Sequence, residues 1–196
     1  MPTPCSEPPG EPPAYPAGVP LLESTRLRLR APLRTDFPNV ARLWGDPEVA
    51  RFTIGRPATA EESWTRLLRN TGHWALLGYG LWMVEERDSG AFVGEVGVLN
   101  LEREITPSLE GMPEMGWVLL PQAHGRGFGT EAVRMALAWV DANLDCPRSV
   151  CIIAAENAAS VRLADKCGFR HLSTGRYRGA PIEIYARPRG LLLSRS

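Results

Sequence analysis

The chain has 196 residues, 44% of them apolar and 22% charged, which suits one globular domain with room for an appendage. Basic and acidic side chains number 22 each, so the composition provides no large basic field for nucleic acid. No run of about 20 apolar residues predicts a membrane helix. The N-terminus also lacks the basic-then-apolar pattern of a secretory signal. We therefore expect a cytoplasmic protein.

The four cysteines give no sign of a metal site. Cys5, Cys146, Cys151 and Cys167 show neither CxxC spacing nor a ligand pattern with the three histidines. We expect free thiols in a reducing compartment and no bound metal.

Proline marks the first boundary of the predicted domain. Eight of the residues in 1–20 are proline, which lacks an amide donor and fixes φ, so neither a helix nor a central strand is expected there. We predict a disordered tail over 1–20, a folded domain over 21–190 and a C-terminal tail over 191–196.

The first half of the domain is predicted to contain strands and helices. Thr59 is a plausible helix N-cap, with Glu62 three residues later as its capping-box partner. Gly90 suits the turn of a hairpin at 87–90. The predicted helices cover 36–50, with breaks at prolines, and 59–77. The predicted strands lie near 26–30, 79–87, 91–101 and 113–120.

The second half predicts an α/β (α+β) architecture with some parallel pairing. A glycine-rich stretch precedes an apolar helix, and a short apolar run typical of a buried parallel strand follows. These three segments are 125–129, 130–143 and 150–154. A helix over 157–168 and two strands over 169–177 and 181–188 complete the chain.

The glycine-rich stretch between the predicted strand and helix is suited to a phosphate. Glycines allow main-chain amides to approach a ligand closely, and a helix N-terminus adds free donors and partial positive charge. A P-loop is excluded because Lys166, the only lysine, lies far downstream. The dinucleotide fingerprint also fails, because Thr130 stands where its third glycine should be. From the loop alone, a tight turn that binds nothing remains an equal alternative.

Three motifs resemble the GNAT superfamily of acyl-CoA N-acyltransferases. Residues 124–129 (HGRGFG) resemble its first motif, with His124 in place of the usual Gln or Arg. Residues 157–160 (NAAS) and 166–169 (KCGF) resemble a second block. Residues 25–30 (TRLRLR) are typical of the RimJ/RimL-like branch, which includes ribosomal-protein N-terminal acetyltransferases. The resemblance covers about residues 22–188.

The resemblance implies a mixed, strongly twisted sheet of about seven strands with helices on both faces, in which a splayed pair of strands holds acetyl-CoA. It implies that one strand contacts the pantetheine arm, that the loop amides hold the pyrophosphate, and that Asn157 contacts CoA. By residue type alone, Asn157 is also a good helix N-cap. The implied cofactor-binding residues are Trp117, Val118, Leu119, His124, Gly125, Arg126, Gly127, Phe128, Gly129, Thr130, Asn157 and Ser160.

The reaction that the resemblance implies requires a base, because only a neutral amine attacks a thioester. At pH 7, deprotonation costs about 4–5 kcal/mol for a lysine amine and only about 1 kcal/mol for an α-amine. Glu114 is the first candidate base and Glu95 the second, and for each an ion pair with an arginine is an equal alternative. The amide of Val118 or Leu119 is the expected oxyanion donor.

Ser160 is the predicted partner of the leaving thiol. Many relatives carry a tyrosine seven residues after the motif asparagine, and Ala164 stands there in this chain. We also expect that one of Trp44, Trp64 and Trp74 lines the acceptor pocket.

The acceptor stays open between a protein N-terminal α-amine and a small-molecule amine. We expect a monomer or homodimer with no direct nucleic-acid contact and no membrane contact. The alternative functions are a non-catalytic acyl-CoA-binding module and, less directly, an RNA binder that uses the arginines at 26–34.

Overall fold

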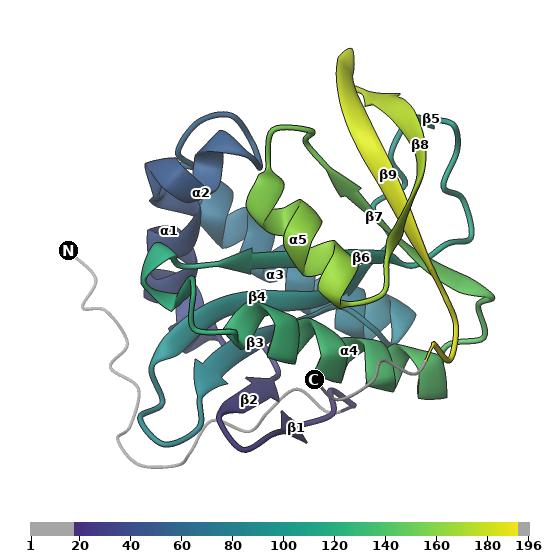
Figure 1. Ribbon diagram of the computed structural model, residues 1–196. Coiled ribbons are helices and arrows are strands. Elements are labelled where there is room, and N and C mark those ends of the chain that lie inside the picture. Colours follow the sequence, from purple (N-terminus) through teal and green to yellow (C-terminus); the bar gives the residue numbers. More distant parts are fainter. Residues whose placement is uncertain (1–17, 192–196) are drawn as a thin grey trace.

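The computed structural model describes residues 18–191, so the predicted tails lie almost wholly outside it. The described residues form a mixed sheet of nine strands in the order β1-β2-β3-β4-β6-β7-β9-β8-β5 (Figure 1). About seven strands were expected, and the difference is β1 and β5, which have two residues each and are too short to show a hydrophobic period. The mixed α/β architecture is confirmed.

Each predicted segment corresponds to an element of the structure. The strands are β1 (Leu22–Glu23), β2 (Leu27–Arg30), β3 (Leu81–Glu86), β4 (Phe92–Leu99), β5 (Ile105–Thr106), β6 (Glu114–Leu119), β7 (Arg148–Ile153), β8 (Arg170–Tyr177) and β9 (Ala180–Pro188). The α-helices are α1 (Phe37–Gly45), α2 (Pro47–Arg51), α3 (Ala60–Leu77), α4 (Phe128–Asn143) and α5 (Ala158–Lys166), and short 3-10 turns cover Arg34–Asp36 and Pro121–Ala123.

Local signals explain where the helices begin. The capping box of α3 forms as predicted. Thr59 Oγ1 accepts from the Glu62 amide at 3.2 Å, and Glu62 Oε2 accepts from the Thr59 amide at 2.9 Å. The predicted helix over 36–50 is divided into α1 and α2, because Asp46 is extended and caps α2 through its side chain. Within residues 18–191, none of the helices is both long and apolar enough to cross a membrane.

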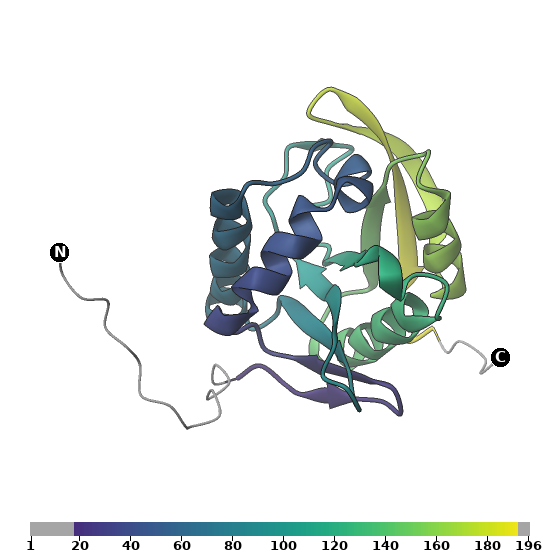
Figure 2. The same cartoon turned by 90° about the vertical axis from the view of Figure 1, so that its left-hand side faces the viewer.

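The sheet separates two layers of helices. Figures 1 and 2 show α4 and α5 on one face and α1, α2 and α3 on the other. The first face is covered by the apolar stripe of α4, in which Ala132, Val133, Ala136, Leu137 and Val140 are buried. The second face has its own core, in which Leu43, Trp44, Leu67 and Met83 pack with Leu120.

The centre of the sheet contains a parallel pair that separates. β6 pairs with β4 at six positions, from Glu114 opposite Leu99 to Leu119 opposite Gly94. With its parallel neighbour β7, however, β6 pairs only at Glu114 opposite Val150. The two strands therefore part after Glu114, and the rest of β6 has no strand partner on that side.

Candidate active site

The unpaired edge of β6 presents main-chain groups to the gap beside β7. The Leu120 amide donates to Val93 O at 3.0 Å, and hydrogen-bonded pairs alternate along an antiparallel ladder. The main chain of Val118, opposite Glu95, therefore also points toward β4. The main-chain groups of Trp117 and Leu119 point toward the gap instead. Of the two predicted oxyanion donors, the register favours the Leu119 amide.

The glycine loop leads directly into the N-terminus of α4. Gly125 and Gly127 have φ of 73° and 80°, which other residues adopt only with strain. The first amide bonded within α4 is that of Glu131, which donates to Gly127 O at 3.2 Å. The three preceding amides, those of Phe128, Gly129 and Thr130, have no carbonyl one turn back to accept them, so this end of the helix suits an anion.

The side chains of the loop hold it in place. Arg126 pairs with Glu86 at 2.6 Å, and its guanidinium lies 4.3 Å from the centre of the Phe128 ring. Its carbonyl accepts from Arg26 at 3.0 Å, and Arg26 is also paired with Glu131. Arg126 is nevertheless half exposed, so a bound phosphate could reach it.

His124 contacts the elements on either side of the loop. Its Nε2 lies 3.2 Å from Leu119 O, and its Nδ1 lies 3.9 Å from a carboxylate oxygen of Glu48. These contacts connect the loop to the end of β6 and to α2.

Two residues of the second motif lie on the far side of the gap. Asn157 caps α5, because its side-chain oxygen accepts from the Ser160 amide at 3.1 Å. Ser160 Oγ accepts in turn from Trp117 Nε1 at 3.2 Å, which joins α5 to β6. Since that hydroxyl accepts a bond, its own proton is available to a ligand. Ala164, at the position of the family's tyrosine, is fully buried.

Glu95 is buried in the sheet and carries a perturbed carboxyl group. It is 2% exposed, and Trp44 Nε1 donates to its Oε2 at 3.0 Å. Burial raises its pKa from 4.5 to about 7, although the Trp44 bond and the charges of Arg66 and Arg69 act in the opposite direction. A carboxylate that titrates near neutral pH is suited to proton transfer.

Glu114, the first candidate base, forms an ion pair. Arg103 Nε and Nη2 lie 3.0 and 3.2 Å from its two carboxylate oxygens. Glu95 and Glu114 share the face of the sheet toward α1 and α3, but Glu95 is opposite Val118, four positions along β6 from Glu114. That separation is about 13 Å along the strand. The two carboxylates therefore have different surroundings.

The sequence did not single out three arginines that approach this face. Arg66 lies 3.9 Å above the Trp44 ring, and Arg69 is one turn further along α3. Arg103 lies in the segment after β4 and is also 4.8 Å from the Tyr177 ring. In the sequence, the only sign that Arg66 and Arg69 lie together was their spacing of three positions within a predicted helix.

The arginines of β2 are neutralised by carboxylates. Arg28 pairs with Glu23 at 3.0 Å, and Arg30 pairs with both Asp36 and Glu85 at 2.7 and 2.8 Å. The basic residues of β2 are therefore engaged in ion pairs within the fold.

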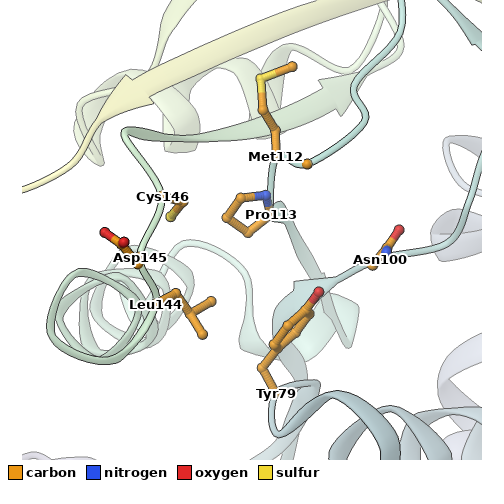
Figure 3. A pocket seen from close by; sticks show the side chains of 8 residues that line it. Tyr79, Asn100, Met112, Pro113, Leu144, Asp145 and Cys146 are labelled. Carbon is orange, nitrogen blue, oxygen red and sulfur yellow. The ribbon is translucent and has the colours of Figure 1, made fainter.

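A cavity of about 230 Å³ lies at the start of β6, beyond the opposite end of the strand from the glycine loop (Figure 3). None of the predicted site residues lines this cavity. Its wall includes Pro113, which Figure 3 shows between Tyr79 and Cys146. Burial raises the pKa of the thiols of Cys146, Cys151 and Cys167, so none of these three is favoured as a thiolate nucleophile that would form a covalent acyl-cysteine intermediate.

A parallel pair that parts in front of a glycine loop and a helix N-terminus is the architecture typical of acyl-CoA N-acyltransferases. Residues 26–170 match the acetyltransferase (GNAT) domain, and the chain belongs to this family. It is 28% identical over 169 residues to the uncharacterized protein YkkB of Bacillus subtilis (strain 168). The aligned residues make up 85% of this chain and 94% of YkkB.

Solved structures agree with this assignment. The putative GnaT-family acetyltransferase from Bordetella pertussis has a TM-score of 0.75 at 28% identity, covering 86% of this chain and 99% of that one. Two more distant structures share the fold. One is the Salmonella typhimurium acetyl transferase that modifies an N-terminal serine of a 50S ribosomal protein (TM-score 0.67, 17% identity, 84% and 96% covered). The other is the Vibrio cholerae spermidine N-acetyltransferase in complex with CoA and spermine (TM-score 0.68, 18% identity, 85% of this chain and 97% of that one covered).

Proposed function

We propose that this protein transfers the acetyl group of acetyl-CoA to a primary amine by direct attack in a ternary complex. The observation that carries the proposal is the parting of β6 from β7 after Glu114, directly before the glycine loop. The gap offers main-chain groups to an extended acyl arm, and the loop offers amides to a diphosphate.

Acetyl-CoA would be held mainly by the main chain. The amides of 125–130 bind the pyrophosphate at the N-terminus of α4, with Arg126 beside it. The main-chain groups of Trp117 and Leu119 bind the pantetheine arm, and Asn157 contacts CoA from the opposite side of the gap. The Leu119 amide then stabilises the oxyanion when the thioester carbon becomes tetrahedral.

Glu95 is the base that the geometry favours. Its raised pKa of about 7 allows it to accept a proton from the attacking amine near neutral pH, directly or through a water. Glu114 would not be the base that accepts this proton, because its carboxylate is already paired with Arg103. An α-amine requires only about 1 kcal/mol of deprotonation at pH 7, so a base of this strength suits it better than a lysine amine.

The remaining step is the departure of CoA. The carbon–sulfur bond breaks, the acetyl group stays on nitrogen, and CoA leaves as a thiolate. Because the pKa of a thiol is only about 8.5, the thiolate is a good leaving group that takes up a proton from water afterwards, so a hydrogen bond from Ser160 suffices where relatives use a tyrosine. The buried Ala164 favours one second candidate, an acyl-CoA-binding module without catalysis.

The test is acetyl-CoA binding followed by turnover with a panel of amines. We expect saturable binding of acetyl-CoA and release of free CoA with at least one N-terminal peptide or small amine. Saturable binding with no turnover across the panel supports the non-catalytic module, and no binding refutes both. The panel also addresses the acceptor, which remains open between an α-amine and a small-molecule amine. A monomer or homodimer in the cytoplasm remains our prediction.

A further inference from the structure

The face of the sheet that carries Glu95 is approached by three guanidinium groups. Arg66 and Arg69 are separated by three positions on α3 and therefore project from the same side of that helix. Arg66 lies on the Trp44 indole, and the same indole donates its N–H to Glu95. Arg103 approaches from the segment after β4.

These positive charges exceed the carboxylates available to them. Within residues 18–191, Arg103 pairs with Glu114, whereas neither Arg66 nor Arg69 has a carboxylate within ion-pair distance. Two nearby carboxylates, Glu62 and Asp36, are each bound to other arginines, and Glu95 is held by Trp44.

Both unpaired guanidiniums are partly desolvated. Burial and the charge of Arg103 lower the pKa of Arg66 and of Arg69, whereas the charge of Glu95 acts in the opposite direction on both. Charged groups that lose hydration in this way are usually compensated by an opposite charge. Within residues 18–191 neither guanidinium has such a partner, so a bound anion would supply the missing charge.

We propose that the acetyl acceptor is an amine that carries a carboxylate or phosphate close to its amino group, and that Arg66 and Arg69 bind this anion. The inference rests on the proposed function and names its substrate class. Arg66 and Glu95 contact one indole, so an amine beside Glu95 places a neighbouring anion near Arg66. A guanidinium binds both carboxylate and phosphate through paired N–H groups. Polyamines such as spermidine are repelled by the same charges.

The experiment uses matched pairs of acceptors and the full chain. One pair is Glu-Ala-Ala-amide and Gln-Ala-Ala-amide, which represents a peptide N-terminus. The other pair is L-alanine and L-alanine amide, which represents a free amino acid, and spermidine serves as a cationic probe. CoA release gives kcat/KM, and calorimetry measures the binding of each probe to the CoA-saturated protein.

Two variants and one control locate the effect. Arg66→Gln and Arg69→Gln each remove one charge. Arg148→Gln removes the charge of an exposed arginine at the start of β7. We expect the acidic member of at least one pair to be preferred by about tenfold or more, which corresponds to one charged hydrogen bond. This preference should fall toward unity in Arg69→Gln and Arg66→Gln and persist in the control, with KM for acetyl-CoA unchanged.

Equal use of neutral and acidic members, a preference for spermidine, or a preference that survives in both variants overturns the proposal. The pair that shows the preference identifies the source of the anion. If no amine is acetylated, the proposed function fails, and calorimetry still decides this inference. Arginine-dependent binding of an acidic probe then supports the anion site at Arg66 and Arg69, and absence of such binding overturns it.

Discussion

Replacing Glu95 with glutamine tests the assignment of the base. Glutamine has the same shape and its side-chain oxygen still accepts from Trp44 Nε1, so Glu95→Gln removes only the ionisation. A general base contributes about 10²–10⁴-fold, and we expect kcat to fall by that factor while acetyl-CoA binding is unchanged. In the wild type, activity should rise with pH through about 7 as Glu95 ionises. That limb should disappear in the variant.

The same pKa predicts how stability depends on pH. The pKa of Glu95 rises from 4.5 in the unfolded chain to about 7 in the folded protein. Between these two pH values the unfolded chain has lost the proton that the folded protein still holds, so an increase in pH favours unfolding. The free energy of unfolding therefore falls as pH increases from about 4.5 to 7 and is level above that range. At about 1.4 kcal/mol for each pKa unit, the loss is about 3 kcal/mol relative to Glu95→Gln, which has no such titration.

The two measurements are CoA release across pH 5–9 and urea unfolding of both proteins at several pH values. Subtracting the variant from the wild type cancels the titration of the other groups, because the charged neighbours of residue 95 (Asp36, Arg66 and Arg69) are the same in both proteins. A variant that keeps the wild-type rate and pH limb refutes the role of Glu95. Parallel stability curves refute the raised pKa itself.

Three further substitutions examine the rest of the site. Gly127→Ala places a side chain at a φ of 80°, which costs about 1–2 kcal/mol, and we expect calorimetry to show weaker acetyl-CoA binding. The control is Gly55→Ala, because Gly55 has the same φ but lies in open space, and this variant should bind acetyl-CoA normally. Ser160→Ala should lower kcat by less than about tenfold in steady-state assays, because the thiolate is a good leaving group at a pKa of about 8.5. Glu114→Gln should lower the free energy of unfolding by about 1–3 kcal/mol in urea, because Arg103 loses its charged partner, and should leave the pH limb near 7 in place. A lost limb in that variant transfers the role of base to Glu114.

The geometry of the glycine loop was predictable because it depends on the main chain. Gly125 and Gly127 have positive φ, and Asn157 caps α5, each for reasons that a few neighbouring residues determine. The family and the α/β architecture follow from the same local motifs.

The ion pair expected as an alternative for each glutamate forms at Glu114, but the particular partners of the two carboxylates were not predictable, because they depend on contacts between distant segments. Glu95 meets Trp44 from α1, 51 positions away, and its raised pKa follows from burial by that layer. Glu114 meets Arg103 across an irregular segment with no periodic pattern. Our proposal that Glu95 rather than Glu114 is the base therefore rests on these contacts and not on the sequence pattern.

The most direct test of the central claim is amide NMR of the labelled protein during titration with CoA. We predict saturable shifts of the amides of 125–130 and of Leu119, with smaller changes in the distant β8–β9 hairpin. CoA binding that leaves the amides of 125–130 unchanged would contradict the account, because the diphosphate would then lie elsewhere.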